Sequence, residues 1–194
     1  PPIQVVIVPI YRNDEQLDVI SEKANEIARK LIAKGVSVKI YSRTTYKPGW
    51  KIAQYELKGV PLRNAMGPRD LENGTLEIAR RDTLEKTSID QQSVTEYVLE
   101  TLDAIQQSLF NKARDYRETH ITQVDTFDEF KQVLNEKGGF VLAHWDGTDA
   151  TEERIKDLTK ATIRCIPLGN KKEAGNCILT GAPSEQRVLF AKAY

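Results

Sequence analysis

Hydrophobic and polar positions follow a regular succession over the first part of the chain. Residues 3–10, IQVVIVPI, form an apolar run rich in β-branched residues, which predicts a strand buried on both faces. After a polar break, apolar residues recur at spacings of three and four: Leu17, Ile20, Ala24, Ile27 and Leu31. This spacing predicts an amphipathic helix, with Asp14 as its N-cap and Gly35 just beyond its end.

The same pattern continues to about residue 118. Residues 36–41 alternate like a strand, Pro48 and Gly59 bracket a short helix, and residues 60–66 and 75–81 predict an antiparallel pair joined by a turn at 67–74. A long helix running to about Arg117 follows, with one apolar stripe: Val94, Val98, Leu102, Ile105 and Leu109. The order β-α-β-α-β-β-α predicts an α/β domain, a three-layer sandwich around a mixed sheet, over residues 1–118.

Residues 119–194 start a new pattern. The segment TFDE at 126–129 is a capping box, and Gly138 and Gly139 end the helix that it begins. Residues 140–145, 161–167, 177–180 and 187–194 are apolar enough for short strands, and 151–160 for a helix. The sequence therefore predicts a second, smaller α+β domain over residues 119–194.

Charge changes this picture only locally. The net charge of the 194 residues is zero, which argues against a general coat for DNA or other nucleic acids. Residues 39–86 nevertheless carry 10 Lys/Arg against 6 Asp/Glu, whereas residues 115–160 carry 6 against 11. The asymmetry indicates a basic face on the first half, or an ordinary solvated surface. No apolar run approaches the roughly 20 residues that span a membrane, so we expect a cytoplasmic protein without a membrane partner.

Sequence motifs for catalysis are absent. No glycine-rich phosphate loop follows the first strand, which disfavours a nucleotide-binding α/β enzyme, and no Ser-His-Asp or Cys-His set can be recognised. His120 and His144 lie in no motif, and Cys165 and Cys177 belong to no paired-cysteine motif. A structural zinc site needs four ligands. We therefore predict no catalytic residue, no metal and no cofactor in this chain, and a recognition module instead.

One stretch suggests what is recognised. ELKGVPLRNAMGPRDLENG, residues 56–74, places Glu56, Arg63, Arg69 and Asp70 around one strand and its exit. An arginine can donate to O6 and N7 of guanine, and a carboxylate can accept from its N1–H and amino group. Specific RNA recognition targets unpaired bases of this kind. The alternative is a surface cluster of ion pairs with no ligand.

A family resemblance bears on that choice. The segment YKPGWKIAQYELKGVPLRNAMGPRDLENG closely resembles the anticodon-binding domain of prolyl-tRNA synthetases of the archaeal/eukaryotic-like type. The broad pattern, K-x-x-x-x-E-x-x-G-V-P and then G-x-x-x-x-x-x-G, is shared with threonyl, histidyl and glycyl relatives, whereas KPGW and GPRDLENG are closer to the prolyl family. The segment ATIRCIP and the ending FAKAY resemble the extra C-terminal domain of that family.

The resemblance implies a role for each site residue. Positions matching Glu56, Arg63, Arg69 and Asp70 lie against the anticodon in the family, and proline anticodons end in two guanines. The C-terminal carboxylate, here on Tyr194, points toward the catalytic domain in relatives. The resemblance also implies a C-terminal fragment of a homodimeric enzyme whose upstream catalytic domain joins proline to its tRNA with ATP and Mg²⁺.

The chain departs from the family in places. Ile52 stands where an aromatic residue is common, and Arg69 where lysine is common. Zinc-binding relatives carry cysteines where this chain has Asp146, Thr151 and Thr180, and only Cys177 of that set remains. We therefore expect the C-terminal domain to fold without metal. The rival interpretation is a stand-alone tRNA-binding or interaction module that has no catalytic parent.

Overall fold

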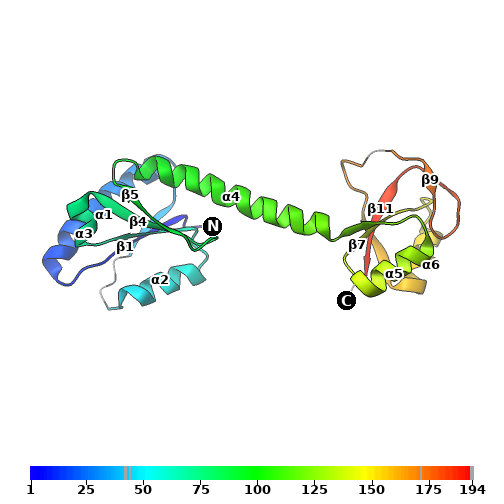
Figure 1. Cartoon of the computed structure of the whole chain (residues 1–194), viewed down its shortest axis with the longest axis horizontal. Coiled ribbons are helices and arrows are strands. Elements are labelled where there is room, and N and C mark those ends of the chain that lie inside the picture. Colours follow the sequence, from blue (N-terminus) through cyan, green and yellow to red (C-terminus); the bar gives the residue numbers. More distant parts are fainter. Residues whose placement is uncertain (42, 44, 171, 193–194) are drawn as a thin grey trace. The chain divides into compact units, whose positions relative to one another are not determined.

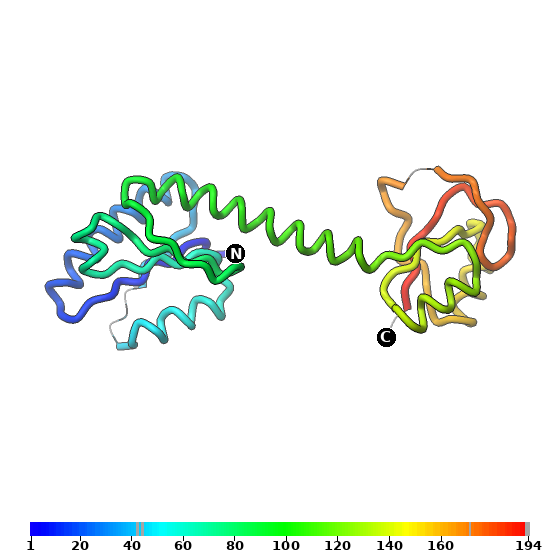
Figure 2. The backbone as a smooth tube through the Cα atoms, viewed as in Figure 1, coloured from blue at the N-terminus to red at the C-terminus, as the bar shows by residue number. Residues whose placement is uncertain are grey.

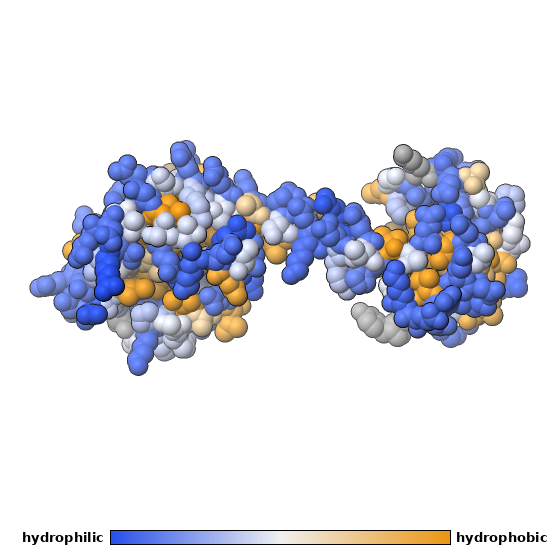
Figure 3. Space-filling model, viewed as in Figure 1, coloured by the Kyte–Doolittle hydropathy of each residue, from blue (hydrophilic) through white to orange (hydrophobic). Residues whose placement is uncertain are grey.

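The computed structural model describes residues 1–41, 43, 45–170 and 172–192. The chain divides into two compact units, Pro1–Asn111 and Lys112–Tyr194. The division falls inside the long helix α4, Val94–Thr119, whose face visible in Figure 3 is mostly hydrophilic. The boundary expected from the sequence lies at the end of this helix. Tyr194 lies outside the described residues.

The first unit is built on a five-stranded mixed sheet in the order β2-β1-β3-β4-β5 (Figure 1). Its strands are β1 (Val5–Pro9), β2 (Val38–Ile40), β3 (Leu62–Met66), β4 (Thr75–Arg80) and β5 (Lys86–Asp90). Strands β1, β2 and β3 are parallel, and β4 and β5 continue the sheet as antiparallel neighbours. The predicted mixed sheet is therefore confirmed.

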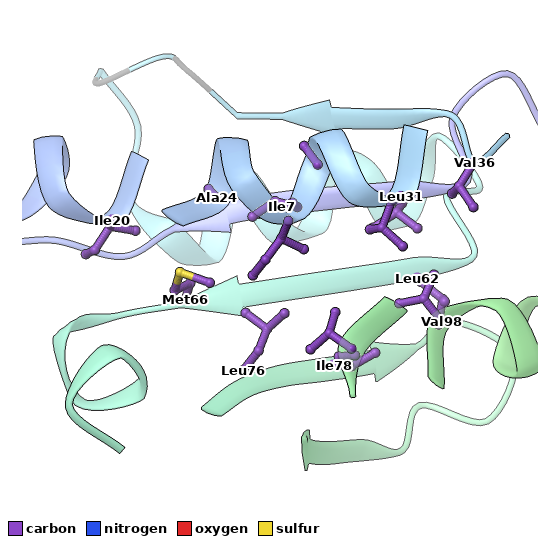
Figure 4. Close-up of a cluster of buried hydrophobic side chains, with 14 of the residues drawn as sticks. Ile7, Ile20, Ala24, Leu31, Val36, Leu62, Met66, Leu76, Ile78 and Val98 are labelled. Carbon is purple, nitrogen blue, oxygen red and sulfur yellow. The ribbon is translucent and has the colours of Figure 1, made fainter. Parts of the chain in front are cut away.

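Helices cover both faces of this sheet. On one face, α1 (Asp14–Ala33) and α4 bury the cluster drawn in Figure 4, in which Ile20 and Leu31 of α1 pack near Ile7 and Leu62 of the sheet. On the other face, α2 (Pro48–Leu57) packs Tyr55 against Val6 and Val8 of β1 and against Tyr41 and Val60. The result is the predicted three-layer α/β arrangement.

Several details differ from the sequence prediction. The side chain of Asn13, and not Asp14, caps α1 by accepting a hydrogen bond from the Gln16 amide at 3.0 Å. Leu109, predicted on the buried stripe of α4, is exposed. Strand β5 was not predicted because its sequence, KTSID, is mostly polar. Its residues lie at the edge of the sheet and are almost all exposed. The predicted turn at 67–74 contains a helix, α3 (Pro68–Asn73).

The second unit holds a four-stranded sheet in the order β6-β7-β11-β8, with β11 in its interior (Figure 2). Its strands are β6 (Ile121–Gln123), β7 (Phe140–His144), β8 (Ala161–Cys165) and β11 (Arg187–Lys192), and β9 (Gly175–Asn176) pairs separately with β10 (Pro183–Ser184). Helix α5 (Phe127–Gln132) continues into a π-helical turn, η1 (Val133–Lys137), and α6 (Asp149–Thr159) follows β7. This unit has the predicted α+β composition.

In this unit the helix cap was predicted correctly from the sequence, whereas the short strands were not. Thr126 and Glu129 form the predicted capping box of α5, and Phe130 packs edge-on against Phe190 in the core. The predicted strand at 177–180 is wrong. Cys177 donates its backbone N–H to Ala182 O at 2.8 Å and accepts from the Gly181 N–H at 2.9 Å, which makes the segment the tight turn between β9 and β10. Strands β6, β9 and β10, of two or three residues, carry no readable pattern.

Candidate nucleic-acid interface

Helix α3 is made by its own local sequence. Pro68 occupies the first turn, where no N–H is needed, and the Asp70 carboxylate accepts a hydrogen bond from the Gly67 N–H at 2.8 Å. Gly74, with a φ of 65°, supplies the left-handed residue that ends the helix. These signals place Arg69 in an exposed first turn directly after β3, and they occupy part of the hydrogen-bonding capacity of Asp70.

Arg69 and Asp70 line a hollow of about 510 Å³ beside the end of β1. The hollow lies where β1 and β3, both parallel, reach their carboxyl ends, and its other walls include Tyr11, Arg12 and Gln16. In open α/β sheets, ligands bind outside the carboxyl ends of strands where the connections diverge. Strand β1 lies between β2 and β3, so this gap is such a position.

Arg63 lies on the opposite side of β3, on the sheet face that α2 covers. It is paired in register with Val6 of β1, and it is only 6% exposed. Its Nη1 donates to the Glu77 carboxylate at 3.3 Å, and its Nε, which is buried, has no hydrogen-bond partner among the described residues. The guanidinium therefore keeps one buried donor that no described group satisfies, beside a carboxylate partner that is half-exposed.

Glu56 completes the predicted set from α2. Its side chain is exposed, and its backbone oxygen accepts from Arg81 Nε at 2.9 Å, which ties the end of α2 to the loop after β4. Glu56 and Arg63 border one shallow depression, together with Ile52. The structure therefore brings the four predicted residues together as two pairs, Glu56 with Arg63 and Arg69 with Asp70, which line two separate hollows.

Sequence reasoning missed three residues that belong to this region. Tyr11 and Arg12 line the hollow of Arg69 but lie in a polar segment that has no motif. Lys51 is the lysine of the K-x-x-x-x-E pattern, and it is 2% exposed. Its Nζ lies 5.2 Å from the centroid of the Tyr11 ring and 4.8 Å from that of Tyr41.

Lys51 is a cation held by aromatic faces. It forms no ion pair with a carboxylate in the part of the chain that the structure describes, and burial lowers the pKa of its ammonium group. Attraction to the two rings offsets part of the desolvation cost of the charge. A lysine on the buried side of an otherwise amphipathic helix was the signal that could have identified it.

In the second unit, a hydrogen-bonded network stands where zinc-binding relatives are expected to hold metal. Asp146 accepts from the Thr151 and Thr180 hydroxyls at 2.8 Å each, and from the Thr148 hydroxyl at 2.9 Å. Burial raises the pKa of Asp146, but the hydrogen bonds from Thr151, Thr180 and Thr148 outweigh it and hold the pKa at about 2. Among the described residues, no group of three or more His, Cys, Asp or Glu side chains is arranged to hold a metal ion.

Comparison with known families identifies the first unit. Residues 4–101 match the family model described as anticodon binding domain. The chain belongs to the anticodon-binding domain family. Residues 127–194 match a second family model, described as prolyl-tRNA synthetase, C-terminal. The two matches cover the two units in the order in which an anticodon-binding domain and its C-terminal extension would follow each other.

Similar curated proteins carry one name. The chain is 64% identical over 193 residues to a proline–tRNA ligase of Christiangramia forsetii, 61% to that of Flavobacterium johnsoniae and 60% to that of Porphyromonas gingivalis. Each match covers 100% of this chain and 39% of the relative. The chain therefore spans about two fifths of the length of these relatives. No helix in the described part of this anticodon-binding chain is long and apolar enough to cross a membrane.

Proposed function

We propose that the chain is the C-terminal part of a proline–tRNA ligase and reads the anticodon of the tRNA for proline. The observation that carries this proposal is the succession, in one chain, of matches to an anticodon-binding domain and to a prolyl-tRNA synthetase C-terminal domain. The basic and acidic side chains at the ends of β3 supply the chemistry. Arg63 and Arg69 donate to guanine O6 and N7, whereas Glu56 and Asp70 accept from its Watson–Crick edge.

The pairing seen in the structure supports a model in which each pair of residues contacts one guanine. Proline anticodons end in two guanines, and the proposed readers form two pairs, each with one arginine and one carboxylate. Glu56 with Arg63 would contact one guanine, and Arg69 with Asp70 the other. Because Asp70 already accepts the Gly67 N–H, only its remaining acceptor capacity serves the base.

The proposal extends to the parent protein. In this proposal the parent protein joins proline to its tRNA and uses ATP with Mg²⁺ in an upstream catalytic domain. It acts as a homodimer of the archaeal/eukaryotic-like type and works in the cytoplasm. In this proposal residues 1–118 are the anticodon-binding domain and 119–194 the C-terminal domain, a boundary near the end of α4 at Thr119 and seven residues beyond the division of the compact units after Asn111.

Binding to tRNA transcripts tests the anticodon proposal. Arg69→Ala and Glu56→Gln should each weaken binding of the proline tRNA by about 1–3 kcal/mol, the range for a good base contact. They should also reduce the preference over a transcript in which one anticodon guanine is replaced by cytosine. Arg29→Ala, an exposed arginine on α1, is the matched control. If both variants keep the wild-type affinity and preference, these residues do not read the anticodon.

A further inference from the structure

A second hollow of about 350 Å³ lies between β2 and α2. Its walls include three cationic side chains and three aromatic rings: Lys39, Arg43, Lys58, Tyr41, Trp50 and Tyr55. No acidic residue contributes to its described lining. The remaining lining residue is the neutral Gln54, so all the charge on this concave surface is positive, although the net charge of the chain is zero.

Helical spacing separates this hollow from the proposed guanine readers. Trp50 lies in the first turn of α2, and Lys58, eight residues further on, is the C-cap of the helix, about 80° around the axis from Trp50. Glu56 precedes Lys58 by two residues, which turns it about 200° around the helix. Glu56 accordingly borders the depression of Arg63, whereas Lys58 borders this hollow. The two hollows share Tyr55 as a wall and no other described residue, so their charged side chains belong to different sites.

The cations of the hollow are not neutralised by the protein. Within the described residues, Lys39, Arg43 and Lys58 form no ion pair with a carboxylate; Lys58 Nζ instead lies 5.1 Å from the centroid of the Tyr55 ring. Lys51, buried beneath Tyr41, adds a further positive charge nearby. Unpaired cations in a concave surface concentrate a positive potential that attracts anions.

The aromatic wall has a free stacking surface. Trp50 is 43% exposed although it stacks on Tyr46, with ring centroids 3.8 Å apart and an interplanar angle of 15°. The stack holds the indole in one orientation at the mouth of the hollow. Exposed aromatic rings next to a positively charged groove are the combination with which proteins hold single-stranded nucleic acid.

We propose that this hollow binds the phosphodiester backbone of an unpaired RNA segment, with one base stacked on Trp50. The inference rests on the proposed function, because it gives α2 a second RNA contact on the flank opposite to Glu56. Phosphate contacts and base stacking carry no base identity. The hollow would therefore raise affinity for the tRNA without contributing to the choice of anticodon.

The experiment measures tRNA binding of the full chain at several salt concentrations, with proline tRNA and with a transcript in which one anticodon guanine is changed. Arg43→Ala and Lys58→Ala together should reduce the slope of log affinity against log salt by about 0.7 for each lost contact with a single strand. Trp50→Ala should weaken binding by about 5- to 150-fold, the loss expected for one stacked base, whereas Trp50→Phe should retain much of the affinity. Both transcripts should be affected equally. Lys34→Ala, an exposed lysine on the far end of α1, is the matched control.

Three outcomes would overturn the inference. The first is a wild-type affinity and salt slope in the double variant and in Trp50→Ala. The second is a loss confined to the unaltered anticodon, which would make the hollow part of the base-reading site, and the third concerns an acidic partner. Polyglutamate serves as a probe for an acidic protein partner. Such a partner would be indicated if polyglutamate displaces the RNA, and if its own affinity falls in Lys58→Ala but not in Trp50→Ala. A wild-type chain without any anticodon preference would count against the proposed function, while the salt slopes would still decide whether the hollow binds RNA.

Discussion

The Arg63 guanidinium and the Glu77 carboxylate form an ion pair in which the arginine is buried and the glutamate is half-exposed. The arginine side chain is 7% exposed and the glutamate side chain 39%, and their closest atoms lie 3.3 Å apart. Exposed pairs contribute little to stability, whereas a buried charge that loses its partner is costly. The half-exposed Glu77 carboxylate therefore positions the buried Arg63 guanidinium. We expect an incoming base to replace Glu77 or to share the guanidinium with it.

This relationship separates a reading role for Arg63 from a purely structural one. Arg63→Lys should reduce the preference for guanine by about 1–3 kcal/mol, because lysine lacks the planar fork that contacts O6 and N7 together. Glu77→Gln should leave the preference intact, since the guanidinium remains and the amide oxygen of glutamine can still accept its hydrogen bond. Binding of the two transcripts and thermal unfolding measure this. Equal losses of preference in both variants would indicate that the ion pair itself, and not Arg63, is needed.

Lys51 predicts a pH dependence of the first unit. Burial lowers the pKa of its ammonium group in the folded protein, so between that pKa and the ordinary value of 10.5 the unfolded chain binds more protons. Stability should therefore rise with pH in this window, and Lys51→Met should remove that contribution. Urea unfolding from pH 7 to 9.5 in a Trp145→Phe background, where Trp50 reports on the first unit alone, measures the difference. Parallel pH profiles for the two proteins would refute it.

Gly175 lies against a buried histidine and has no room for a side chain. A Cβ at this position would clash with the His144 ring, and His144 is 3% exposed and hydrogen-bonded at Nδ1 to the Ser184 hydroxyl at 3.1 Å. Because a rigid ring cannot give way, Gly175→Ala should destabilise the second unit by about 1–3 kcal/mol.

Gly169 supplies the matched control. It is exposed, and no atom lies within 4 Å of the Cβ that alanine would add. Gly169→Ala should therefore change stability by no more than about 0.5 kcal/mol. Urea unfolding followed by Trp145 fluorescence in a Trp50→Phe background compares the two, and equal stabilities would mean that His144 moves aside.

Asp146 predicts loss of stability in acid. Burial opposes its ionisation, but hydrogen bonds from the three threonines keep its folded pKa at about 2, below the ordinary 3.8. Its contribution is thus complete above about pH 4 and is lost as pH falls through about 2. Asp146→Asn should cost about 1.5–3 kcal/mol at pH 7, since the hydrogen bonds are no longer made to a charge. The same variant should also lose less stability than the wild type as the pH falls from about 4 to about 2, which urea unfolding at each pH measures. Asp157→Asn, on the exposed face of α6, should lose as much stability as the wild type over this range.

The same network bears on metal content. Asp146, Thr151 and Thr180 stand at positions where the family resemblance led us to expect zinc ligands, and here the Asp146 carboxylate accepts hydrogen bonds from both threonine hydroxyls. We expect well under one zinc per purified chain, measured by inductively coupled plasma mass spectrometry after dialysis. A stoichiometric zinc that survives dialysis and is lost in Asp146→Asn would mean that Asp146 and a neighbour such as His144 bind metal.

Features that depend on near neighbours in the chain could be predicted from the sequence alone. The apolar run of β1, the three-four spacing of α1, Pro48 and Gly59 around α2, and the Thr126–Glu129 capping box are local signals, and each element formed where they indicated. The candidate readers Glu56, Arg63, Arg69 and Asp70 came from the same stretch, because their chemistry and the family motif are written in consecutive residues.

Only the tertiary structure decided how those residues are used. The pleat of β3 places Arg63 on the α2 face, whereas α3 places Arg69 and Asp70 beside β1, so one predicted set became two pairs. Gly175 against His144, and Thr180 with Asp146, join residues 31 and 34 positions apart. Strand β5 is polar and forms because β4 offers it an edge. The deciding interactions are contacts between side chains or strands, several of them far apart in sequence, which no local pattern of hydrophobic and polar residues encodes.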